Sequence, residues 1–70
     1  MKYQGKLIKL KDVDVIGEIT SEVAIEDSGF YKILVKWPDG HPKTFIHTAD
    51  LTDEDQILDK DNNLAEATAI

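Results

Sequence analysis

Residues 15–37 decide the fold, and they read VIGEITSEVAIEDSGFYKILVKW. Apolar and polar side chains alternate through residues 15–26, which is the pattern of a strand with one buried and one solvated face. The odd positions of this strand are predicted to face the interior: Val15, Gly17, Ile19, Ser21, Val23 and Ile25. Gly17 interrupts that apolar row and predicts a bulge or a bend, which a small curled sheet needs.

The second strand of this stretch runs from Phe30 to Trp37 and is more apolar than the first. Its odd positions, Tyr31 to Trp37, form a continuous apolar face. Its other face mixes Lys32 and Lys36 with Phe30 and Leu34. A strand with this composition is expected at the centre of a sheet, partly covered on both sides.

Shorter elements extend the pattern in both directions. Residues 3–10 predict a first strand and residues 43–48 a fourth, centred on Phe45 and Ile46. Glycine-bearing turns at 27–29 and 38–42 separate the later strands, since glycine accepts a positive φ without steric cost. Strands joined by such short polar links can form only an antiparallel meander.

The edges of so small a sheet need protection, so the sheet either closes or is capped. The predicted fold class is mainly β: a small curled antiparallel sheet or an SH3-like barrel of four to five strands. A short C-terminal helical or disordered acidic segment follows. Thr52 is predicted to cap a helix whose first turn holds Asp53, Glu54 and Asp55. The expected organisation is a β domain over 1–51 and an acidic segment over 52–70 that packs on it or frays.

Charge is distributed in blocks along the 70 residues. Residues 1–49 are neutral overall, and the net charge of −6 belongs to residues 50–70. In the simpler interpretation, oppositely charged strands lie side by side and the acidic end is solvated, as charged runs usually are. In the second interpretation, the acidic segment folds over the lysine-rich first strand or meets a basic partner.

Composition excludes several classes of protein. The absence of cysteine excludes disulfide scaffolds, cysteine-ligated zinc and thiol catalysis. All eight basic residues are lysine, so no guanidinium is present to read guanine edges, and nucleic acid is not favoured as a partner. No apolar run approaches the roughly 20 residues of a membrane span. We expect a cytoplasmic protein with no membrane contact.

No constellation of residues predicts catalysis, a metal or a cofactor. His41 and His47 are six residues apart on extended chain, about 20 Å, so one ion cannot bind both. Residues 59–63 begin like a calcium loop, but Leu64 and Ile70 stand where glycine and glutamate are required. There is no Gly-x-Ser-x-Gly motif and no glycine-rich phosphate loop, so we predict a non-catalytic protein.

Residues 29–40, GFYKILVKWPDG, followed by Asp50-Leu51, resemble chromodomain-like and Tudor-like members of the SH3-like barrels. The resemblance covers residues 15–51 and rests on a Tyr-x-x-x-Val-Lys-Trp strand. It implies peptide binding, in some members of methylated lysine in an aromatic cage. Trp37 matches a cage tryptophan, whereas Gly40 stands where a second aromatic residue often lies.

Tyr3 is a candidate replacement for a missing cage residue, and Tyr31 and Phe45 are further aromatic candidates. A cage needs several aromatic faces around one cation. Tyr31 and Trp37 share the face predicted to be buried, so a role in the core is the favoured interpretation of these aromatic residues.

We expect a small protein–protein interaction module, accessory or regulatory, that binds a protein partner or forms a homodimer. The alternative is an acidic decoy, in which residues 50–70 occupy the basic site of a nucleic-acid-handling protein. The predicted binding surface is the outward side of the sheet with its hairpin end, because apolar side chains there are too exposed for a free monomer. It comprises Phe30, Lys32, Leu34, Lys36, Trp37, Asp39 and His41.

Overall fold

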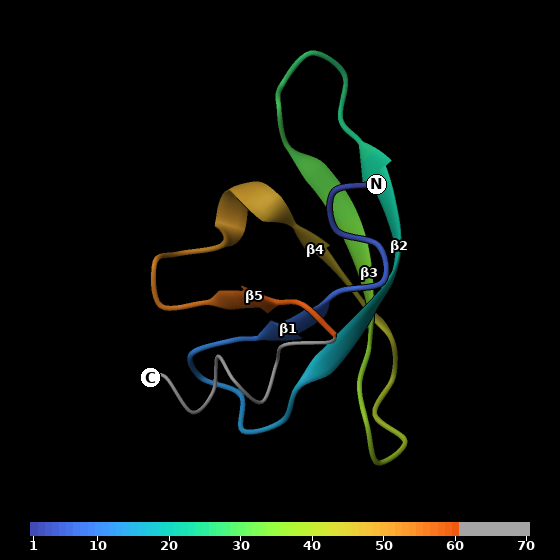
Figure 1. Cartoon of the computed structure of the whole chain (residues 1–70), viewed down its shortest axis with the longest axis vertical. Helices are drawn as coiled ribbons and strands as arrows, with labels where there is room; N and C mark the ends of the chain where they lie inside the picture. The colour runs from blue at the N-terminus through green and yellow to red at the C-terminus, as the bar shows by residue number, and fades with distance from the viewer. Residues whose placement is uncertain (61–70) are drawn as a thin grey trace.

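A computed structural model describes residues 1–60 and shows a mainly β protein (Figure 1). Its five strands form one antiparallel sheet in the order β4-β3-β2-β1-β5. The strands are β1 (Leu7–Lys9), β2 (Gly17–Ala24), β3 (Tyr31–Lys36), β4 (Thr44–His47) and β5 (Gln56–Leu58). One 3₁₀ turn, η1 (Thr48–Asp50), follows β4. No helix within residues 1–60 has the length and apolarity needed to cross a membrane.

β2 is the longest strand, and it bends along its length (Figure 1). It pairs with β1 near its start and with β3 throughout. The register with β3 shifts between Ile19 and Ser21, so Thr20 is an extra residue on β2. The bulge therefore lies at Thr20, not at Gly17 as predicted. The Thr20 hydroxyl donates to the Leu34 carbonyl at 3.2 Å.

The bulge reverses which side chains of β2 face inward. Beyond it, Glu22 lies opposite Ile33 and shares the core face, whereas Val23 lies opposite Lys32 on the outward face. The prediction that Val23 belongs to the core is wrong, because its side chain is 62% exposed. A shift of one residue exchanges the two faces of a strand, since side chains alternate with period two.

The core follows the predicted face of β3. Ile33 and Val35 are fully buried with Ile8 and Ile19, and Tyr31 and Trp37 pack half-buried against them. Gly17 has a packing role: a Cβ there would lie 2.8 Å from the Trp37 ring and would also overlap the Val35 side chain. Glycine is required at residue 17 because the side chains of β3 approach its backbone so closely.

The predicted helix after Thr52 is wrong. Residues 52–55 form a turn in which the Asp55 carboxylate accepts hydrogen bonds from the backbone amides of Thr52 at 2.8 Å and Lys11 at 2.9 Å. The chain then enters β5, where Leu58 lies opposite Leu7 and is buried. A short helix is marginal in water, whereas a strand here pairs with the free edge of β1. The part of the acidic segment beyond residue 60 lies outside the described residues.

The sheet is curled but open. Within the described residues, β4 pairs only with β3, and β5 pairs only with β1. Of the two predicted alternatives, the structure therefore shows an open sheet and not a closed barrel. The unpaired edges belong to β4 and β5, which η1 and the 52–55 turn connect.

Candidate functional site

The outward side of β2, β3 and β4 collects exposed apolar residues. Two cross-strand rows cover it: Val23, Lys32 and His47 form one, and Ser21, Leu34 and Phe45 form the other. Phe30 precedes β3 on the same side, because it alternates with Tyr31. We name this surface the outer face and define it by Val23, Phe30, Lys32, Leu34, Phe45 and His47. Val23, Phe30 and Phe45 are 62%, 44% and 64% exposed.

Contacts within the outer face hold its aromatic side chains in place. The Lys32 ammonium lies 5.2 Å from the centroid of the Phe45 ring, a cation–π contact. The Phe30 ring lies 5.9 Å from the His47 imidazole, tilted by 51°. His47 is itself fixed, since its Nδ1 accepts a hydrogen bond from the Ala49 amide at 3.1 Å. The surface is therefore partly preorganised.

The predicted binding residues separate into two groups. Phe30, Lys32, Leu34 and Lys36 lie together on the outward side of β3, at alternate positions. Trp37 lies on the core side, where its indole Nε1 donates to the Thr44 hydroxyl at 3.1 Å.

Asp39 and His41 lie in the β3–β4 hairpin turn, away from the strands. Asp39 and Gly40 both adopt positive φ there, 62° and 76°. The His41 amide donates to the Pro38 carbonyl at 3.4 Å and closes the turn. This part of the predicted surface is thus separate from the rows of the outer face.

Sequence reasoning missed Val23, Phe45 and His47 as members of this surface. Val23 was missed because the bulge at Thr20 is set by the partner strand, which period-two counting does not include. The outward position of Phe45 could have been predicted from the sequence. It alternates with Ile46 in a four-residue strand, so only one of the two side chains can face the core.

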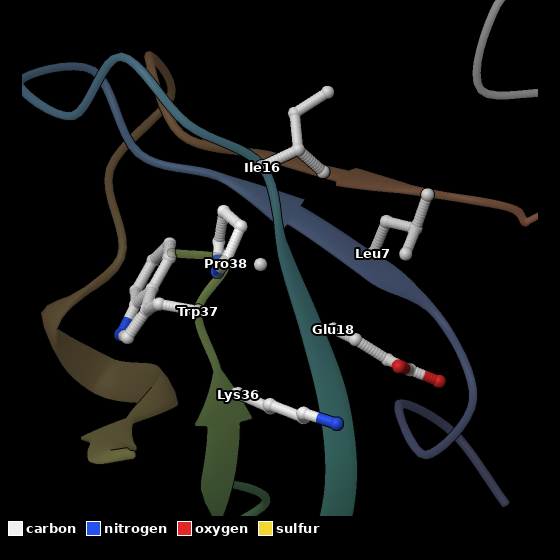
Figure 2. A pocket seen from close by; sticks show the side chains of 7 residues that line it. Leu7, Ile16, Glu18, Lys36, Trp37 and Pro38 are labelled. Carbon is white, nitrogen blue, oxygen red and sulfur yellow. The ribbon is translucent and has the colours of Figure 1, made fainter. Parts of the chain in front are cut away.

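Figure 2 shows a small hollow beside the start of β2, lined by Leu7, Ile16 and Pro38 and by the Glu18 and Lys36 side chains. Its volume is about 200 Å³, below the roughly 300 Å³ at which ligand pockets begin. The Lys60 ammonium lies 2.7 Å from Glu18 and lowers the pKa of that carboxyl, through a hydrogen bond first and charge second. Glu18 therefore stays ionised at neutral pH and forms an ion pair.

The described part of the acidic segment lies beside the lysine-rich start of the chain, where β5 pairs with β1. The Asp59 carboxylate lies 3.1 Å from the Lys6 ammonium, and the Glu54 carboxylate lies 3.5 Å from that of Lys11. Both carboxylates keep much of their surface exposed to solvent, and the rest of the acidic segment lies beyond the described residues 1–60. These exposed pairs add little stability individually, and they lie on either side of β5 in the chain.

The aromatic residues do not assemble into one cage. The Tyr3 and Tyr31 rings meet edge-on at 5.3 Å, with the Lys2 ammonium 5.6 and 6.0 Å from their centroids. Trp37 lies six residues along extended chain from Tyr31, about 20 Å away. Phe45 is on the opposite side of the sheet. Residues 1–60 also contain no group of three or more His, Asp or Glu side chains that could hold a metal ion.

No family model, curated protein or solved structure matches the chain. The resemblance of residues 15–51 to SH3-like barrels therefore stays a prediction.

Proposed function

We propose that the protein is a non-catalytic interaction module whose outer face binds an apolar, acid-bearing surface of a partner protein. The supporting observation is the exposure of Val23, Phe30 and Phe45 on one side of three adjacent strands. Contiguous apolar surface of this kind on a soluble chain marks an interaction site. The aromatic side chains also suit this role, because they offer large contact area at low entropic cost.

Charge on the outer face indicates the chemistry of the partner. Lys32 lies within the outer face and Lys36 at its border, whereas the chain as a whole carries a net charge of −6. A partner with carboxylates around an apolar centre is complementary to this arrangement. A second copy of the chain is disfavoured, because a twofold interface through this face brings like-charged lysines together.

The acidic-decoy function receives less support than the binding module. Of the described carboxylates in the acidic segment, Glu54 and Asp59 pair with lysines of the chain itself. Asp55 accepts hydrogen bonds from two backbone amides. These groups are already engaged, so residues 50–60 are a poor imitation of a free polyanion.

Selection from a displayed library of random dodecapeptides tests the proposal. We expect the wild-type chain to enrich peptides that combine aromatic or aliphatic residues with Asp or Glu. The Phe45→Ser variant should lose at least tenfold in affinity for them. Ile16→Ser is the matched control, since Ile16 is an exposed apolar residue outside the outer face. Dispersed NMR spectra of both variants would establish that they fold.

Three results would overturn the proposal. The first is that the peptides whose affinity falls in Phe45→Ser are basic and not acidic, and the second is equal affinity of wild type and Phe45→Ser for the acid-bearing peptides. The third is a dimer in light scattering that Leu34→Lys abolishes, which would assign the face to a second copy of the chain.

A further inference from the structure

The free edge of β4 borders a concave surface on the core side of the sheet, away from the outer face. Two hollows of about 410 and 420 Å³ adjoin there and share Leu10 and Val13 as walls. Thr44 lines the first hollow and Ile46 the second, and both residues belong to β4. The two hollows together, which we name the seam groove, therefore follow β4 along its length. Each is large enough to hold several side chains.

The edge beside the seam groove is able to accept another strand. Within residues 1–60, β4 pairs with β3 alone, so the backbone groups on its other side have no sheet partner. β4 contains neither proline nor glycine, the residues that interrupt edge pairing. An extended peptide adds to such an edge through main-chain hydrogen bonds, and neighbouring pockets receive its alternate side chains.

The two halves of the seam groove differ in chemistry. The half near the β3–β4 hairpin is apolar, with Val15, Trp37 and Pro42 in its lining. The half near η1 has Asp12, Asp50 and Asp55 in its lining, with Lys11 as the one basic residue there.

The acidic half keeps its negative charge because its lysine is already engaged. The Lys11 ammonium lies 3.5 Å from Glu54. Hydrogen bonds from the Thr52 and Lys11 amides lower the pKa of Asp55, so its carboxylate is ionised at neutral pH. An incoming cation meets an excess of carboxylates there.

We propose that the seam groove binds an extended segment of a partner protein that pairs with β4, places an apolar side chain against Trp37, and places Lys or Arg near Asp12 and Asp50. β4 is four residues long, so the segment needs about four to six residues at about 3.3 Å each. β4 runs from the apolar half to the acidic half. An antiparallel segment therefore carries its basic residues first and its apolar residue last. This site uses the free edge and the core-side surface of β4, whereas the outer face uses the outward Phe45 and His47 side chains of the same strand. It goes beyond the proposed function.

Peptide titration of the full chain, followed by NMR of its backbone amides, tests the inference. The probe is an acetylated and amidated hexapeptide, Lys-Lys-Thr-Val-Thr-Leu. We expect shifts at Thr44–His47 and at Val13, and at least tenfold tighter binding than for the same peptide with two glutamates in place of the lysines. N-methylation of alternate backbone amides should remove binding, because it blocks strand pairing. Equal binding of the reversed sequence would overturn the proposed placement.

Variants separate this site from the outer face. Val13→Ser should weaken peptide binding about fivefold, and Asp50→Asn should reduce the preference for lysine over glutamate. Val23→Ser is the matched control on the outer face and should leave binding unchanged. The inference is wrong if Val13→Ser and Val23→Ser weaken binding equally, or if millimolar peptide produces no shift along β4. Neither result touches the outer face, which the dodecapeptide selection tests separately.

Discussion

The two halves of β2 differ in how they obey the alternation of their sequence. Before Thr20, Gly17 and Ile19 face the core as period-two counting predicts. After Thr20, Glu22 turns inward and Val23 turns outward. One extra residue thus converts a predicted core valine into a surface residue. The comparison teaches that the role of a side chain on this strand depends on its position relative to the bulge more than on its hydrophobicity.

Ile19→Ala should have the largest effect, because it removes a fully buried side chain from the regular half of β2. The expected loss of unfolding free energy is about 2–5 kcal/mol. Small domains have few kcal/mol in reserve, so the variant should be substantially unfolded at room temperature. Urea unfolding followed by tryptophan fluorescence measures the change. A loss below about 1 kcal/mol would show that the core is elsewhere.

Gly17→Ala tests the packing at the start of the same half. Its added methyl group overlaps the Val35 side chain and the Trp37 ring, so we expect a loss of about 1–3 kcal/mol from overpacking. The Trp37 indole should also move, which changes its fluorescence maximum. Gly29→Ala is a poor control because Gly29 has positive φ. Ala24→Gly is a better control variant, since Ala24 is exposed at the end of β2 and the exchange involves the same methyl group.

Glu22→Gln tests the irregular half through its contact with the start of the chain. The Glu22 carboxylate accepts hydrogen bonds from the backbone amides of Lys2, Tyr3 and Gln4. Hydrogen bonding to Gln4 is the main cause that lowers the pKa of Glu22 below its ordinary 4.5. We expect the variant to be less stable than wild type at pH 7, with Tyr3 released from Tyr31.

The sign of the pH dependence follows from that lowered pKa. A carboxyl whose pKa is lower in the folded state than in the unfolded state stabilises the folded state fully at pH values above its unfolded pKa. This contribution disappears as the pH falls through the pKa of the folded state. The stability difference between wild type and Glu22→Gln should therefore be constant near pH 7 and shrink below about pH 4.5. Thermal unfolding at several pH values measures it, and a difference that grows on acidification would contradict the assignment.

Val23→Ala should have the smallest effect. Val23 is 62% exposed on the outer face, and substitutions of exposed residues usually change stability by less than about 0.5 kcal/mol. If Val23 faced the core, as strict period-two alternation predicts, the same substitution would cost several times more unfolding free energy. Urea unfolding beside Ile19→Ala therefore compares the two halves of β2 directly. A loss comparable to that of Ile19→Ala would mean that the bulge is absent.

Much of the fold was predictable where local chemistry determines it. The buried face of β3 and the turns at 27–29 and 38–42 follow from alternation and from glycine at positive φ. β5 was not predictable in the same way. Its three residues become a strand because the edge of β1 is free, and no local pattern in residues 56–58 distinguishes that outcome from a helix.

The candidate site was predictable to the same degree. Phe30, Lys32, Leu34 and Lys36 lie on one face because they alternate along a regular strand. Val23 joins them only through the bulge, and the seam groove lies between β4 and the segment that connects β1 to β2. Both features depend on how separate segments of the chain pack against one another. The alternation of a single strand cannot reveal them.

The pairing of β1 with β5 has a consequence for how the chain acquires its structure. β1 lies near the beginning of the described chain and β5 near its end, whereas β2, β3 and β4 are joined by short turns. Local pairs form faster than distant ones, so we expect the β2–β4 meander to assemble first and β1 to wait for residues 56–58. During translation, the ribosome must therefore deliver almost the whole of this region before its first strand is covered on both sides.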